Sequence, residues 1–102
     1  MGKKIAGIQK NRRESEIESW VRSRIESRGG RMFKFISPGT AGVPDRIVLL
    51  PDGVIYFIEF KKAGEQPAPL QQYWLDILAG LGFHAKVIAG MGQAEAFVNG
   101  LC

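Results

Sequence analysis

Apolar residues recur along the chain at two spacings, one typical of helices and one typical of strands. Around residues 12–28 they recur three or four positions apart, with arginine and glutamate between them. This pattern predicts an amphipathic helix that ends at Gly29-Gly30. The apolar positions of this helix are Ile17, Trp20, Val21 and Ile25.

Three strands are predicted next. The segment RMFKFIS (residues 31–37) alternates enough to form a strand, and PGTAG after it is typical of a loop. Residues near 43–50 and 54–61 are strongly apolar and are separated by Pro51-Asp52-Gly53, which predicts a β-hairpin with a tight turn.

The second half of the chain predicts a helix, a strand and a short closing helix. After the polar loop KKAGEQPAP, Pro69 suits the first turn of a helix that runs to about Leu81 and ends at Gly82. The segment FHAKVIA (residues 83–89) predicts a fourth strand, and GQAEAFVNGLC (residues 92–102) the closing helix. The expected apolar stripe of the longer helix is Leu70, Trp74, Ile77 and Leu81.

The order helix, three strands, helix, strand predicts one mixed sheet with helices packed on it, an α/β or α+β fold. Because the last strand follows a helix, it can pair in parallel through a crossover. A chain of 102 residues predicts a single domain. We expect this domain to cover residues 14–102, after a basic N-terminal arm of residues 1–13.

Composition narrows the setting of the protein. Cys102 is the only cysteine, which excludes a disulfide framework and a zinc cluster and fits a reducing, cytoplasmic setting. No apolar run is long enough to span a bilayer, and we recognise no signal peptide. The net charge of +4 fits a polyanionic partner, nucleic acid first. The basic arm, with Lys3, Lys4, Lys10, Arg12 and Arg13, is either a solvated tail or a contact with phosphates.

Charged residues in the apolar hairpin need an explanation, because a buried charge without a partner is costly. If Leu50 pairs with Val54 across the turn, Asp45 lies opposite Glu59 with Cβ atoms roughly 4.5–5.5 Å apart. Two carboxylates in that position repel each other. Lys61 shares the face of Glu59, since the two residues are two positions apart in the strand.

A hard divalent cation would turn this repulsion into attraction. Mg²⁺ prefers oxygen ligands and keeps several waters, so one or two carboxylates are enough. Lys61 could then position an attacking water or hold a phosphate. The alternative is structural: Asp45 caps the turn after Pro44, and Glu59 and Lys61 end an exposed strand. The joint register of the charges favours the metal site.

The sequence around these charges resembles the VRR-NUC family of the PD-(D/E)xK nuclease superfamily. The resemblance depends first on GVPD, which ends at Asp45, and on Glu59-Phe60-Lys61. ESEIESWV, KFISPGTAGVPDRIVLLPDG, YFIEFKKAGE and LQQYWLDILAGLGFHAKVI also match in order and spacing, over roughly residues 14–90. The resemblance implies a restriction-endonuclease-like core with a mixed central sheet in the order α-β-β-β-α-β.

The resemblance also implies roles for individual residues. Asp45, Glu59 and the backbone carbonyl of Phe60 would bind the metal, and Lys61 would be the catalytic lysine. Gln71 matches the family's glutamine on the second helix. For its glutamate on the first helix we prefer Glu18; Glu14, one turn away on the same face, is an alternative, and Glu16 points elsewhere.

Plain structural roles remain open for several of these residues. Ser15-x-x-Glu18 matches a capping box, and Gln71 near a helix start could merely satisfy local backbone groups. Trp20 and Trp74 fall on apolar stripes and are expected in the core. His84 is expected to be a half-exposed sheet residue rather than a general base.

Together these features predict a Mg²⁺- or Mn²⁺-dependent endodeoxyribonuclease of bacterial or phage origin. By analogy with small stand-alone members of the superfamily, which resemble Holliday-junction resolvases, we expect a homodimer that cuts branched DNA such as a four-way junction. The first alternative is a DNA-binding module of nuclease ancestry that does not cut. A second alternative is a structural partner in a larger recombination complex.

Overall fold

The computed structural model of the protein describes residues 13–101. Four of the basic residues expected in the arm, Lys3, Lys4, Lys10 and Arg12, lie outside the described residues, as does Cys102. The elements are α2 (Glu14–Ser27), β1 (Arg31–Lys34), β2 (Arg46–Leu50), the 3-10 turn η2 (Pro51–Gly53), β3 (Val54–Lys61), α3 (Pro69–Gly80), β4 (His84–Ala89) and α4 (Met91–Asn99).

The four strands form one sheet in the order β1-β2-β3-β4. The pairs β1–β2 and β2–β3 are antiparallel, whereas β3 and β4 are parallel, joined by a crossover through α3. The mixed α/β sheet and the parallel last strand are therefore as the sequence predicts.

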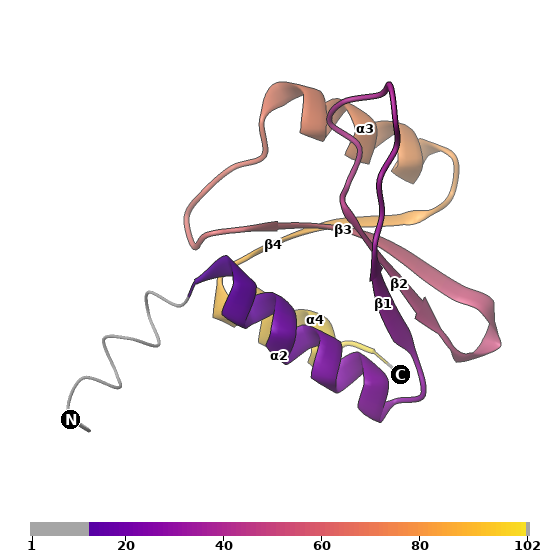
Figure 1. Cartoon of the computed structure of the whole chain (residues 1–102), viewed down its shortest axis with the longest axis vertical. Helices are drawn as coiled ribbons and strands as arrows, with labels where there is room; N and C mark the ends of the chain where they lie inside the picture. Colours follow the sequence, from indigo (N-terminus) through magenta and orange to yellow (C-terminus); the bar gives the residue numbers. More distant parts are fainter. Residues whose placement is uncertain (1–12, 102) are drawn as a thin grey trace.

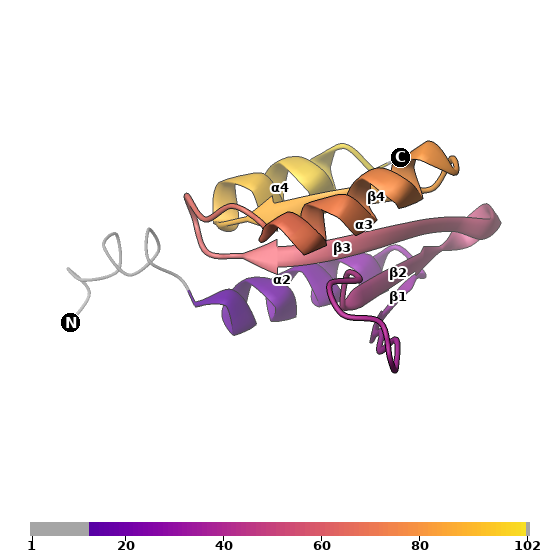
Figure 2. The ribbon, with the colours of Figure 1, turned by 90° about the horizontal axis from the view of Figure 1, so that it is seen from above.

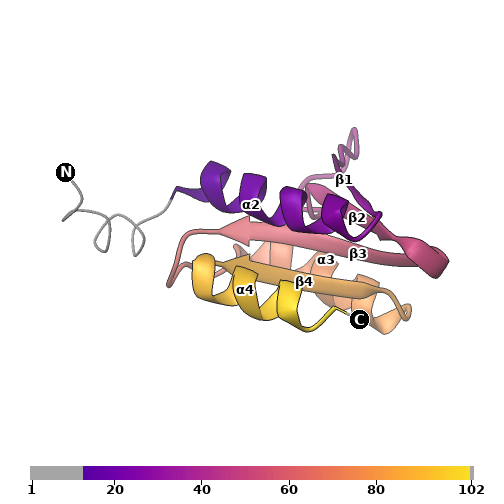
Figure 3. The ribbon, with the colours of Figure 1, turned by 90° about the horizontal axis from the view of Figure 1, so that it is seen from below.

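The helices lie in two layers, one on each face of the sheet. Figure 1 shows α3 on one face and the pair α2 and α4 on the other, and Figure 3 shows that α4 lies beside β4. In Figure 2 the start of α2 lies close to the end of β3. This arrangement brings the first turn of α2 to the end of the sheet where the charged hairpin residues lie.

The main core lies between the sheet and the layer of α2 and α4. Three apolar residues of α2, one turn apart, are buried against inward-facing residues of the sheet, because the helical repeat of 3.6 places them on one face. The buried cluster consists of Ile17, Val21, Ile25, Met32, Val48, Ile58, Phe60, Ile88 and Ala94.

The hairpin has the predicted register. Leu50 pairs with Val54, and the ladder continues to the pair Arg46 and Ile58. The turn between the strands is Pro51–Gly53, in which Asp52 adopts a φ of 68°. Extended by one position past the ladder, this register brings Asp45 toward Glu59, and the charge of Asp45 acts on the Glu59 carboxyl.

Two strands are shorter than predicted. β1 ends at Lys34 rather than Ser37, and β2 begins at Arg46 rather than near residue 43. The single backbone hydrogen bond from Phe35 N to Asp45 O (2.8 Å) continues the contact, and the chain between them leaves the sheet as a loop. Pro44 has no amide hydrogen and so cannot extend the ladder.

The predicted apolar stripe of α3 is wrong as a description of its buried face. The buried residue of this helix is Leu75, whereas Leu70, Ile77 and Leu81 are exposed, Leu81 by 69%. The stripe exists, but it runs along a flank of the helix. The reason is that α3 packs against β4, and no helix within residues 13–101 covers the rest of that sheet face.

Three smaller predictions concern aromatic residues. Trp20 packs against the core with the Arg24 guanidinium 5.2 Å from its ring, and Trp74 is half-buried. His84 is exposed on β4 and stacks on Tyr56 with ring centroids 4.6 Å apart.

None of the helices within residues 13–101 is both long and apolar enough to cross a membrane.

Candidate metal-binding and catalytic site

Glu59 is the one acidic residue among those described that is buried, with 6% of its surface exposed. It lies near the end of β3, on the face that α3 covers. Its Oε2 accepts a hydrogen bond from Gln71 Nε2 (3.1 Å) and lies 3.8 Å from Lys61 Nζ. Both contacts involve Oε2, which leaves Oε1 for a further ligand.

The environment of Glu59 favours its protonated form. Burial first, and then the nearby charge of Asp45, raise the pKa of its carboxyl from 4.5 to about 7, against the opposing effect of Lys61. A buried carboxyl that is protonated in this way is a strong candidate for a cation ligand, because a positive ion beside it would stabilise the ionised carboxylate.

Asp45 lies where the loop rejoins the sheet. Its carbonyl accepts hydrogen bonds from Phe35 N (2.8 Å) and from Arg46 Nη1 (2.9 Å). Its side chain is half exposed, and Oδ2 lies 3.4 Å from Arg46 Nη1. Asp45 therefore presents its carboxylate to solvent at the edge of the buried Glu59.

The backbone carbonyl of Phe60 is directed toward the same place. Lys61 O accepts a hydrogen bond from Gly90 N (3.1 Å) on the β4 side. Successive carbonyls of a strand point alternately to its two neighbours, so that of Phe60 points to the β2 side. Pro44, just before Asp45, lies outside the ladder with β3 and has no amide hydrogen to donate to this carbonyl. The carbonyl is thus available as a third oxygen ligand.

The two candidate glutamates of α2 have different surroundings. Glu18 Oε1 forms a partly buried ion pair with Arg46 Nη2 at 2.6 Å. Glu14, in the first turn, is close enough to Glu59 for its charge to raise the pKa of that carboxyl. The structure thus brings Glu14 to the carboxylates and holds Glu18 against an arginine.

The capping interpretation of Glu18 is wrong. The helix begins one residue earlier than Ser15, and the carboxylate of Glu16 accepts the hydrogen bond from Arg13 N (3.3 Å). The local interpretation of Gln71 is confirmed, and the side chain also contacts Glu59. Its Oε1 accepts a hydrogen bond from Ala68 N (2.8 Å), while its amide nitrogen donates to Glu59.

Arg46 also lies beside these residues, although no motif in the sequence points to it. Its alternation in β2 already places it on the face that α2 covers, where a charge needs a partner. This position could have indicated that an acidic residue of α2 pairs with Arg46, although not which one.

The donor set fits a hard divalent cation in the Mg²⁺ class. Within residues 13–101 no group of three or more His, Cys, Asp or Glu side chains is placed to hold a metal ion. Two carboxylates and a carbonyl are enough for an ion that keeps its waters, and the raised pKa of Glu59 is the observation that favours a cation there.

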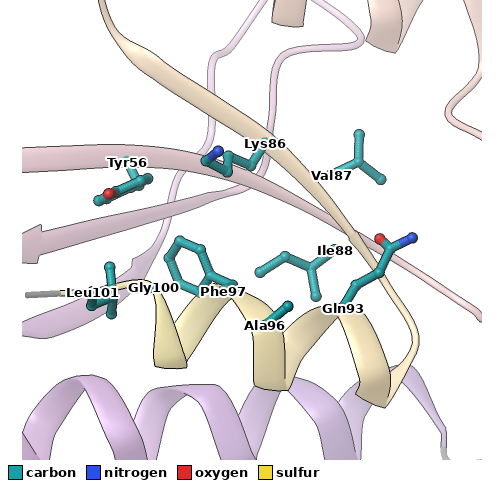
Figure 4. A pocket seen from close by; sticks show the side chains of 9 residues that line it. All are labelled: Tyr56, Lys86, Val87, Ile88, Gln93, Ala96, Phe97, Gly100 and Leu101. Atoms are coloured by element: carbon teal, nitrogen blue, oxygen red, sulfur yellow. The ribbon is translucent and has the colours of Figure 1, made fainter.

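One pocket of the structure does not include these charged residues. A pocket of about 380 Å³ lies between β4 and α4 and is lined by residues that include Tyr56, Lys86, Phe97 and Leu101 (Figure 4). No carboxylate lines it. Asp45, Glu59 and Lys61 therefore do not belong to this pocket.

Comparison with solved structures identifies the fold. A structure described as "VRR_NUC domain" superposes with a TM-score of 0.82 and 28% sequence identity, over 87% of this chain and 97% of the other. The protein has the VRR-NUC fold. A second VRR_NUC domain protein has a TM-score of 0.66 at 22% identity, over 87% of each chain, and supports the fold alone.

Sequence comparison is consistent with the VRR-NUC fold. No family model matches the sequence. Over 59 residues the chain is 51% identical to "Putative nuclease p44" of Acyrthosiphon pisum secondary endosymbiont phage 1. This stretch covers 58% of the present chain and 63% of that relative, so the chain spans less than two thirds of the relative's length. The resemblance seen in the sequence, to VRR-NUC domains of the PD-(D/E)xK superfamily, is confirmed.

Proposed function

We propose that this VRR-NUC protein is a Mg²⁺- or Mn²⁺-dependent endodeoxyribonuclease that hydrolyses phosphodiester bonds. The supporting observation is the buried carboxyl of Glu59, with its raised pKa, next to Asp45 and Lys61. A protein that only binds DNA gains nothing from acidic groups that face phosphates. The similarity to a phage protein named as a nuclease points the same way.

Each residue of the site has a separate task in this proposal. Asp45, Glu59 and the Phe60 carbonyl hold the cation, and Glu14 adds negative charge beside them. Lys61 orients the attacking water or contacts the scissile phosphate, where its charge stabilises the developing negative charge. Gln71 fixes the orientation of the Glu59 carboxyl through its hydrogen bond.

The cation, when bound, would lower the pKa of a coordinated water and stabilise charge on a phosphoryl oxygen. The oxygens of Asp45 and Glu59 are arranged for that ion and not for the phosphate. The half-exposed Asp45 faces solvent, so the backbone of a DNA strand can approach without opening the fold.

The substrate is proposed by analogy with small members of the superfamily. We propose branched DNA, such as a four-way junction, cut by a homodimer whose two sites act on two strands. With such a substrate, the bacterial cytoplasm is the expected place of action. Arg13, at the start of α2, together with the basic residues before it, would contact phosphates near the site.

Cleavage of plasmid DNA and of a synthetic four-way junction, with Mg²⁺ or Mn²⁺, tests the proposal. We expect Lys61→Met to lower the cleavage rate about 100-fold or more, and Asp45→Asn to abolish metal-dependent cleavage. The matched control is Asp76→Asn, which changes an exposed aspartate on α3 that accepts a hydrogen bond from Gln72.

The outcomes separate the candidate functions. Wild-type protein that binds DNA without cutting it under any metal would support the non-cleaving module instead. Equal cutting by wild type and Asp45→Asn would place the chemistry elsewhere.

A further inference from the structure

We infer that Arg46 and Glu18 form a positioning pair that holds Asp45 at the edge of the metal site. This inference rests on the function proposed above. It assigns to Glu18 an action through Arg46 and not a direct contact with the cation.

Arg46 is the residue that holds the side chain of Asp45. Asp45 precedes the first residue of β2, so the strand ladder does not fix it. Phe35 N anchors its carbonyl, but only Arg46 reaches both its carbonyl (2.9 Å) and its carboxylate (3.4 Å) among the described contacts. Without this contact, the half-exposed side chain of Asp45 could adopt several rotamers. Fixing one of them when a cation binds would weaken the binding.

Glu18 in turn holds Arg46. The Nη2–Oε1 distance is 2.6 Å, and the two side chains are only 14% and 19% exposed. Within the described part of the chain, Arg46 Nε is buried without a hydrogen-bond partner. The guanidinium is thus oriented by its two ends, with one nitrogen on Glu18 and the other on Asp45. The residues that neighbour Glu18 on α2 are buried in the core, which fixes the position of this helix. Glu18 therefore fixes Arg46, and Arg46 in turn fixes Asp45.

Glu18 also limits how strongly Arg46 competes with a cation. A guanidinium with no other partner would form a bidentate pair with Asp45 and withdraw its carboxylate from the site. With Glu18 in place, the charge of Arg46 is shared between two carboxylates. The ion pair therefore holds Asp45 in place while leaving it able to bind metal.

The test compares metal affinity with stability in the double variant Glu18→Leu/Arg46→Met. The two substitutions leave the net charge unchanged, and replacement of both members of a buried pair by apolar residues is often neutral for stability. We expect Mn²⁺ affinity, measured by isothermal titration calorimetry, to fall about 10- to 100-fold. We expect the midpoint of urea unfolding to stay close to that of the wild type.

Unchanged or tighter Mn²⁺ binding by the double variant would overturn the positioning role. If the double variant does not fold, Arg46→Lys decides, because one ammonium group cannot bridge both carboxylates in the same way. Weaker Mn²⁺ binding by Arg46→Lys supports the role, and wild-type affinity overturns it.

A matched control uses another partly buried arginine on the same face of the molecule. Arg22 Nη1 donates a hydrogen bond to the carbonyl of Met32 and does not reach the site. Arg22→Met should lower stability without changing Mn²⁺ affinity. A wild-type protein that binds no Mn²⁺ would overturn the metal site and the positioning role with it, whereas wild-type binding with an unaffected double variant would overturn only the pair's role.

Discussion

Burial of Glu59 raises the pKa of its carboxyl, so the protonation state of this group matters at neutral pH. The group is surrounded by protein and lies next to a second acid, so the metal-free protein holds the proton up to about pH 7. Cation binding requires that this proton leave. At the residue scale, the proposed metal binding would therefore be coupled to pH through one side chain.

This coupling predicts how the stability of the metal-free protein depends on pH. Below about pH 4.5 the carboxyl is protonated in both the folded and the unfolded state; between pH 4.5 and about 7 the folded state keeps the proton that the unfolded state loses. The free energy of unfolding should therefore fall as pH rises through this window, by on the order of 3 kcal/mol, and stay low above it.

Urea unfolding at pH 5 and pH 8, in the presence of a chelator, measures this dependence. Glu59→Gln, which cannot ionise, should remove most of the difference between the two pH values. An identical difference in wild type and Glu59→Gln would contradict the raised pKa of Glu59.

At the scale of elements, the loop between β1 and β2 sets the position of Asp45. Its two ends meet at the hydrogen bond from Phe35 N to Asp45 O, and its middle packs on the start of α3. Gly42 has a φ of +89°, and a Cβ built on it would lie 2.6 Å from Leu70 Cγ. The loop and α3 are thus in close contact at this one residue.

Gly42→Ala should loosen that contact. We expect it to lower the free energy of unfolding by about 1–3 kcal/mol more than Gly39→Ala does, because overpacking adds to backbone strain. Gly39 is the matched control, since it also has a positive φ (+80°) but a Cβ added there would meet no atom within 4 Å. Urea unfolding of the two variants provides the comparison. An equal loss of unfolding free energy in both would show that the contact with Leu70 does not affect stability.

At the scale of the whole molecule, the helices within residues 13–101 cover one sheet face only in part. α3 contacts β4, whereas the strands on the other side of that face expose Phe33 and Leu49. The exposed flank of α3, with Ile77 and Leu81, belongs to the same side of the molecule, which supports our proposal of a homodimer that covers this surface.

The dimer proposal predicts that a charge on this flank separates the chains. Leu81→Glu should convert a dimer to a monomer, because an ionised side chain would be buried in an apolar interface. Ala79→Glu, at an exposed position two residues away in the chain and on another side of the helix, is the control. Light scattering measures the mass of each variant; a wild-type protein that is monomeric would rule the dimer out.

The sequence by itself determined the elements, the hairpin register and the opposition of Asp45 and Glu59. These depend on local periodicity and on turn length, which act between residues close in the chain. The resemblance carried by GVPD and by Glu59-Phe60-Lys61 led to the same fold that the solved structures show.

Only the tertiary structure decided which face of α3 is buried, which glutamate of α2 pairs with Arg46, and which one approaches Glu59. Each of these depends on contacts between segments far apart in the chain, and the sequence spacing was compatible with either answer. Glu14 and Glu18 lie on the same face of one helix, so helical geometry alone could not separate them. The position of α2 against the ends of β2 and β3 gives each of them a different neighbour.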